Sequence, residues 1–328
     1  MLDISLLVEY INKIMSKKNP KIPTAGGQAV IEGVMMRSGN TIATAVRRAT
    51  GEIVTQKEER LPLSKKSKLL GLPIIRGALN MIDMLSVGIK TLNWSADIAI
   101  QDELKAEGKE PKKNSSSAAS VALGLVIGVG LFVLLPMLIG KFLGLEKEAF
   151  AFNLAAGGTR VLIFFIYLIS ISFIPDVKRL FQYHGAEHKS IFAYEAGQPL
   201  TVANAQKYKT LHPRCGTSFL LIVVLISIIF FAIADSLIAI IFGFVPNIFA
   251  RFGIHLLLWP IVIGLCYEFL KLSAKLSDKY SWARILIWPG LMLQKITTLE
   301  PTDEMVEVAL TALKEAVGDF KVKQINNN

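Results

Sequence analysis

The chain has 328 residues, of which 52% are hydrophobic and 19% are charged, and its mean hydropathy is +0.47. This composition argues against an entirely soluble protein and is typical of a membrane protein with a substantial water-facing part. The net charge of +10 comes from 36 Lys and Arg against 26 Asp and Glu. No basic stripe with interleaved aromatic residues accompanies this excess, so we expect no nucleic-acid partner and instead basic segments that face anionic lipid headgroups.

Residues 1–102 are ordinary in polarity and predict a water-facing α+β domain, beginning with a short surface helix at 1–20. Residues 24–37 combine glycines with Val and Ile, which predicts a strand with tight turns. Residues 41–46 and 52–57 alternate between apolar and polar around a turn at 49–51, which predicts a β-hairpin. Apolar residues recur at helical spacing over 74–100, so an amphipathic helix is expected to pack on the hairpin or lie on the bilayer surface.

A polar linker at 103–117 separates this domain from four apolar stretches, each of about twenty residues and therefore long enough to cross a membrane. A shorter apolar run at 286–296 contains Pro289 and Gly290 and is expected to pack or to lie at the interface. Residues 297–328 form a C-terminal segment with a predicted soluble helix at 301–323. The expected fold is a membrane α-helical bundle of about four transmembrane helices within 118–296, beside the α+β domain. The four stretches are 118–140, 155–174, 218–242 and 253–270.

Basic residues are distributed unevenly around these stretches. The N-terminal region, the loop at 176–217 and the residues after the fourth stretch are rich in Lys and Arg, whereas the connection between the third and fourth stretches holds only Arg251. Since Lys and Arg near span ends favour the cytoplasm, both termini and the loop 176–217 are expected on the cytoplasmic side. The sequence therefore predicts a multi-pass inner-membrane protein.

Two of the four histidines, His184 and His188, lie four residues apart with Glu187 between them. Positions i and i+4 share one face of a helix, so both imidazoles reach the same point if the second apolar helix continues through Phe181. The order His-x-x-Glu-His is the inverted zincin pattern, in which the histidines bind zinc and the glutamate acts as general base. The alternative is a pair of interfacial histidines, with Glu187 as an ordinary capping or ion-pairing residue.

His212 and Cys215 follow downstream and could complete the metal site. Together with His184 and His188 they would form a closed set of four ligands, which is usual for structural zinc. Three ligands would leave a position open, which is usual for catalytic zinc. The spacing does not decide between the two. Inverted zincins take a third ligand from a glutamate far downstream, and the sequence offers no obvious counterpart beyond Glu195 and Glu268.

The segment 26–37 contains two further candidate site residues, Glu32 and Arg37. Glu32 could supply the missing carboxylate ligand if the Gly26-Gly27 turn brings the segment to the histidines. The alternative is a hairpin edge whose glycines only permit a positive φ. The segment is not a phosphate-binding loop, because it lacks the Gly-Lys-Ser/Thr ending.

Four strings of residues resemble a known family. They resemble the bacterial family of unknown function DUF1385, over nearly the whole chain from about Gly26 onward. The resemblance implies a membrane protein of the bacterial inner membrane and a metal-dependent enzyme, without naming a substrate or a reaction. The strings are Gly26-Gly-Gln-Ala-Val-Ile-Glu-Gly-Val-Met-Met-Arg37, Tyr183-His-Gly-Ala-Glu-His-Lys189, His212-Pro-Arg-Cys-Gly-Thr-Ser218 and Glu300-Pro-Thr-Asp-Glu304.

Two classes of function follow from these observations. The first is a metal-dependent hydrolytic enzyme at the cytoplasmic face, with a divalent ion such as zinc on His184, His188 and one or both of His212 and Cys215, and with Glu187 as the base. The second is a non-enzymatic membrane factor with a structural metal site that assists or regulates other membrane proteins. An open ligand position would favour the enzyme, and a closed tetrahedral set would favour the factor.

Overall fold

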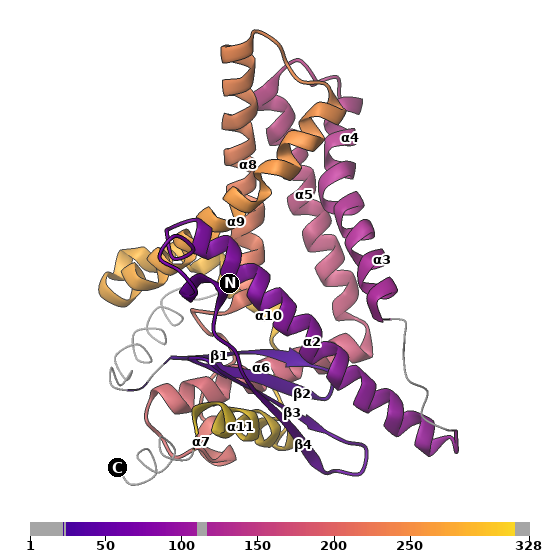
Figure 1. Ribbon diagram of the computed structural model, residues 1–328, viewed down its shortest axis with the longest axis vertical. Helices are drawn as coiled ribbons and strands as arrows, with labels where there is room; N and C mark the ends of the chain where they lie inside the picture. The colour runs from indigo at the N-terminus through magenta and orange to yellow at the C-terminus, as the bar shows by residue number, and fades with distance from the viewer. Residues whose placement is uncertain (1–21, 23, 110–116, 319–328) are drawn as a thin grey trace, which may run out of the picture.

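The computed structural model describes residues 22, 24–109 and 117–318. The surface helix predicted at 1–20 lies outside these residues. Figure 1 shows the two parts of the fold: a bundle of long helices above, and a sheet flanked by helices below. The candidate site lies where the two parts meet.

The water-facing part is built on a four-stranded antiparallel sheet in the order β1-β2-β3-β4. The predicted hairpin is confirmed as β3 (Thr41–Arg47) and β4 (Ile53–Glu59). The preceding segment forms a second hairpin, β1 (Ala25–Val30) and β2 (Gly33–Ser38), in place of the one strand with tight turns that its glycines predicted. The sheet is a simple meander because each strand pairs with the next along the chain.

The two central strands, β2 and β3, are buried on both faces of the sheet, and successive residues of β2 point to opposite faces. Met35 packs with Val87 of α2 (Ile75–Ala106) on one face. Val34 and Met36 pack on the other face against α6 (Pro175–Glu195) and α11 (Asp303–Val317). The sheet is therefore the middle layer between α2 and the pair α6 and α11 (Figure 1). The predicted C-terminal helix is confirmed as α11.

The predicted amphipathic helix is confirmed as α2, which runs on to Ala106 into the segment where a linker is predicted. Its first turns are joined to the membrane part. Arg76 pairs with Glu268 at 2.5 Å, and Asn80 donates a hydrogen bond to the Tyr267 hydroxyl at 3.0 Å. α2 thus packs on the sheet with one part and on the membrane helices with another, which fixes the two parts of the fold relative to each other.

Four helices are long and apolar enough to cross a membrane, in agreement with the predicted bundle, and they indicate a membrane protein. The first combines α3 (Ser117–Val129), the π-helix η2 (Gly130–Leu134) and α4 (Leu135–Phe142). The others are α5 (Ala149–Ser172), α8 (Gly216–Phe242) and α9 (Ile248–Lys279). Arg160 of α5 is buried and donates to the Phe132 carbonyl of the π-helix at 2.7 Å, so this side chain satisfies a group in the irregular turn.

A buried polar cluster joins three of these helices. Asp235 of α8 accepts a hydrogen bond from Asn153 of α5 at 2.8 Å, and its carboxylate lies 3.0 Å from both Arg251 and His255 of α9. The side chains of Asp235, Arg251 and His255 are at most 2% exposed. Charged groups are costly inside a membrane unless they pair, so this cluster fixes how α5, α8 and α9 pack.

The second span does not continue into the histidine motif. α5 ends at Ser172, and a separate helix, α6, begins at Pro175, whose ring suits the first turn of a helix and is unfavourable in the interior of one. Between α6 and α8 lie the short helix α7 (Val202–Ala205) and the loop to Cys215. After α9, the 3₁₀ helix η3 (Ser281–Leu286) and α10 (Trp288–Thr297) lead back to the site; another 3₁₀ turn, η1 (Leu63–Lys65), precedes α2.

Candidate metal centre

The histidine motif lies on α6, whose residues from Tyr183 to Glu195 are all buried. Tyr183 and Ala186 pack into the core beneath the sheet. Gly185 is required by close packing, because a β-carbon there would lie 2.0 Å from the Leu299 carbonyl. This packing fixes the rotation of α6 and therefore the direction in which its histidines point.

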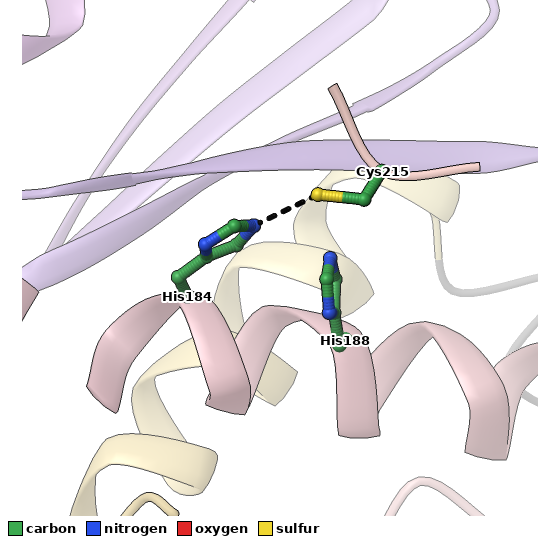
Figure 2. Close-up of side chains that lie close together, drawn as sticks. All are labelled: His184, His188 and Cys215. Carbon is green, nitrogen blue, oxygen red and sulfur yellow. Dashed lines mark hydrogen bonds between the residues drawn. The ribbon is translucent and has the colours of Figure 1, made fainter. Parts of the chain in front are cut away.

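His184, His188 and Cys215 are brought together as predicted ligand types. One ligand atom from each lies within 4.8 Å of the others. Figure 2 shows the two rings projecting from successive turns of α6 toward the Cys215 thiol, which comes from the start of α8. The His184 Nε2 to Cys215 Sγ distance is 3.2 Å, and the two ring centroids are 4.5 Å apart.

Backbone carbonyls hold both imidazoles from behind. His184 Nδ1 lies 2.8 Å from the Thr297 carbonyl oxygen, and His188 Nδ1 hydrogen bonds to the Thr210 carbonyl. A carbonyl oxygen only accepts, so each Nδ1 carries the proton and donates, and each Nε2 keeps its lone pair. Metal-binding histidines are usually held in this way by an acceptor on the far nitrogen.

The Cys215 thiol is the N-terminal cap of α8. Its sulfur accepts a hydrogen bond from the Thr217 backbone N–H at 3.4 Å and lies 3.0 Å from the Thr217 hydroxyl. These contacts hold the sulfur at the start of α8, on the side that faces His184.

The Glu187 carboxylate lies close to the Nε2 atoms of both histidines. Its Oε2 lies 3.5 Å from His188 Nε2 and 3.9 Å from His184 Nε2. The Gly27 backbone N–H of β1 donates a hydrogen bond to this carboxylate. A side chain at Gly27 would meet Glu187, because a β-carbon there would lie 2.8 Å from Glu187 Cγ. The glycine therefore lets β1 approach the site closely.

Burial shifts the protonation of all three groups on α6. It lowers the pKa of His184 and lowers that of His188 to about 4, because the charged imidazolium loses its hydration. Burial also raises the pKa of Glu187. Neutral imidazoles are the form that binds metal ions, so the environment prepares both histidines as ligands.

His212 lies beside the group without joining it. Its ring centroid is 5.4 Å from that of His188 and 4.5 Å from that of Phe192. Gln294 of α10 holds its backbone, accepting from the His212 N–H at 2.7 Å and donating to its carbonyl at 2.8 Å. The Glu195 carboxylate lies 3.9 Å from His212 Nε2 and pairs with Arg214. Glu195 is thus engaged with the loop and not with the histidine pair.

Glu32 and Arg37 are placed away from the three clustered ligands. Glu32 is in the turn between β1 and β2, has a φ of 53°, and pairs with Arg179 while accepting from the Tyr183 hydroxyl at 3.2 Å. Arg37 pairs with Asp83 of α2 at 2.9 Å. Glu32 therefore ties the β1–β2 turn to the start of α6, and Arg37 ties β2 to α2.

Several residues that build the site carried no signal of their own in the sequence. The Thr210 and Thr297 carbonyls are backbone groups, which any residue supplies. Gln294 is fully buried and also donates to Ser218 at 3.2 Å. Lys189, beside the histidine motif, pairs with Glu300 at 2.7 Å. Lys189 and Glu300 each lie within one of the strings that resemble the family. Their presence in those strings is the sequence signal that could have linked the two segments.

Residues 72–319 match the model of a family described as "Protein of unknown function (DUF1385)". The chain is also 35% identical over 308 residues to "Uncharacterized protein YqhQ" of Bacillus subtilis (strain 168), covering 90% of this chain and 93% of that protein. No solved structure matches the chain. Neither description names a metal or a reaction, so these comparisons do not bear out the metal-dependent activity implied by the resemblance. Both matches extend over most of the sequence, and the chain belongs to the DUF1385 family.

Proposed function

We propose that the chain is a metal-dependent hydrolytic enzyme whose ion, a divalent cation such as zinc, binds His184, His188 and Cys215. The observation that carries the proposal is the arrangement of the two imidazoles. Each donates from Nδ1 to a backbone carbonyl, and each directs the lone pair of Nε2 toward the same thiol. A pair of histidines that only packed at an interface would not need this common orientation.

The ligand atoms have the spacing that zinc needs. Ligands about 2.0–2.3 Å from a tetrahedral zinc ion lie roughly 3.3–3.8 Å from one another. The His184 Nε2 to Cys215 Sγ distance of 3.2 Å is close to this spacing, and the whole group lies within 4.8 Å. Two nitrogens and one sulfur suit zinc, which accepts imidazole and thiolate together.

Three protein ligands leave one position of a tetrahedron for a substrate or water, and zinc in such a site supplies Lewis acidity. Glu187 lies within 3.9 Å of both Nε2 atoms, so its carboxylate would face an ion held there. Its carboxylate is placed to accept a proton from an attacking water molecule and to donate it to the leaving group. The Gly27 N–H orients that carboxylate, so β1 acts as a positioning element.

A second candidate function is a non-enzymatic factor with a structural metal, which assists or regulates other membrane proteins. The observation in its favour is burial. Glu187 is 4% exposed, His188 is 1% exposed and His212 is 4% exposed, and the His212 ring lies 5.4 Å from the His188 ring, centroid to centroid. Four His and Cys ligands would close the site.

We further propose that this site faces the cytoplasm of a bacterial cell, with both chain termini on that side of the inner membrane. The argument is the excess of Lys and Arg in the segments that adjoin the site. Exposed lysines near the span ends, among them Lys178, Lys271 and Lys295, would contact anionic headgroups.

Glu187→Gln separates the two functions, because glutamine keeps the volume and an oxygen acceptor but cannot move a proton. If the protein is an enzyme, the Glu187→Gln variant should keep its metal but fail to complement a deletion strain. The His184→Ala variant should fail to complement to the same extent and should also lose its metal. The exposed Glu304→Gln is the matched control and should change neither property. A stable, metal-loaded Glu187→Gln protein that complements fully would exclude the enzyme. Wild-type protein purified without any bound transition metal would exclude both functions.

A further inference from the structure

An exposed aromatic segment follows the fourth membrane helix. Trp282 is 65% exposed and Ile285 is 71% exposed, both on η3. Tyr280 and Trp288 flank them and are 40% and 38% exposed. The Tyr280 and Trp282 rings stack with centroids 6.2 Å apart, so they form one surface. Large apolar side chains gathered in this way on a short irregular segment require a partner environment.

The level of this segment is set by the helices around it. The candidate span within α9 runs from Ile248 to Ser277, and Lys271 and Lys275, exposed on its last turns, indicate that the bilayer surface lies just before Tyr280. The following helix, α10, packs against the first turn of α8, where a β-carbon at Gly290 would lie 2.3 Å from Ser218 Oγ. α8 is apolar from Gly216 onward. Both neighbours therefore place the segment where two spans begin or end, and Figure 1 shows α10 between the helix bundle and the sheet.

The opposite side of the same segment leads into the candidate metal centre. Ala283, Ile287 and Leu291 are at most 4% exposed. One and two turns further along α10, Gln294 clamps the backbone of His212, and the Thr297 carbonyl accepts from His184. The segment therefore has an outward aromatic face and an inward face that holds the site.

We propose that residues 280–288 dock into the lipid headgroup layer, on the membrane side that carries the candidate metal centre. Trp and Tyr prefer this layer because their rings combine apolar and hydrogen-bonding surface. The exposed Lys271 and Lys275 on the last turns of α9 add attraction to anionic headgroups. The docked segment holds α10, and through it the backbone partners of His184 and His212, at the bilayer surface. This inference does not depend on whether a metal binds.

Depth-dependent fluorescence quenching tests the docking. The full-length protein carries Trp94, Trp259, Trp282 and Trp288, and a variant that keeps only Trp282, with Phe at the other three positions, reports on η3. It is reconstituted into phosphatidylcholine–phosphatidylglycerol vesicles that contain lipids brominated near the headgroup or near the chain end. The matched variant keeps only Trp94, which packs against the core of the sheet.

We expect Trp282 to lose more emission with bromine near the headgroup than near the chain end, and Trp94 to lose almost none. Equal, weak quenching of Trp282 and Trp94 would overturn the proposal. So would strong quenching of Trp282 by aqueous iodide in vesicles, which would show that water surrounds it. A Trp282 shielded from both bromine and iodide would overturn it in favour of a protein interface. None of these readouts involves metal content, so their failure is distinct from failure of the proposed function.

Discussion

Replacing Gly27 by alanine should disturb the candidate metal centre, although Gly27 lies on β1, which contributes no candidate ligand. A β-carbon at this position would lie 2.6 Å from the Met35 carbonyl oxygen, 2.8 Å from Glu187 Cγ and 2.9 Å from Met36 Sδ. The first contact is with the backbone of the paired strand, which cannot swing aside. β1 must therefore move, and the Gly27 N–H leaves the Glu187 carboxylate. Gly26→Ala is the matched control, because nothing lies within 4 Å of its added carbon.

The size of the effect follows from two contributions. Inserting a methyl group into packed surroundings costs about 1–3 kcal/mol. Leaving a buried carboxylate without its backbone donor costs about 1–3 kcal/mol more. The Gly27→Ala protein should thus be destabilised by roughly 2–6 kcal/mol, against less than about 0.5 kcal/mol for Gly26→Ala. For a chain of this size that corresponds to a fall in Tm on the order of 10 °C.

Thermal unfolding of the two purified variants in the same detergent measures this difference, with metal content determined on the same samples. Gly27→Ala should unfold at a clearly lower temperature and bind metal less completely. If both variants match the unsubstituted protein in Tm and in metal content, the close approach of β1 to Glu187 is not a feature of the folded protein. A low Tm for Gly26→Ala as well would show that the strand, and not this contact, is sensitive.

Three further predictions concern other parts of the fold. Asp235→Asn should lower stability by about 3–5 kcal/mol, since it leaves Arg251 charged and buried without a counter-ion; a change below about 1 kcal/mol in detergent unfolding would contradict this role. Lys189→Met should destabilise by about 1–3 kcal/mol and Glu300→Gln by less than about 1 kcal/mol, because Lys189 is buried and Glu300 is exposed to water; equal Tm shifts would contradict this. Reporter tags at the two chain ends should both report cytoplasm, and a periplasmic signal from either would refute the proposed orientation.

The parts of the fold that the sequence predicted are those set by local pattern. Apolar length predicts the four spans, alternation predicts β3 and β4, and the period of α2 is visible over most of its length. The hairpin of β1 and β2 was read as one strand with tight turns. Its turn lies at Ile31 and Glu32, where Glu32 adopts a positive φ without being glycine. No residue next to Glu32 in the sequence predicts its positive φ. The ion pair that supports this conformation is with Arg179, on the distant helix α6.

The break between α5 and α6 shows a different limit. Pro175 lies at the break, and a proline near a helix end permits either a kink or the start of a new helix. In the structure a new helix, α6, begins at Pro175, so the orientation of the two histidines has a different physical cause from the one predicted. His184 and His188 point together because α6 is packed between the sheet and the Thr297 and Thr210 carbonyls, not because a membrane span extends to them.

Spacing left open whether one or both of His212 and Cys215 join the two histidines, because both lie on one short loop after the motif. Contacts with two different helices distinguish His212 from Cys215 in the structure. The start of α8 holds the Cys215 sulfur 3.2 Å from His184 Nε2, and the Thr217 N–H donates a hydrogen bond to that sulfur. Gln294 of α10 holds the His212 backbone, and the His212 ring lies beside His188 with its centroid 5.4 Å away. The sequence therefore predicts the candidate ligand types and the helix face that presents the histidines. Which of the two residues on the loop lies against the histidine pair depends on where α8 and α10 hold that loop.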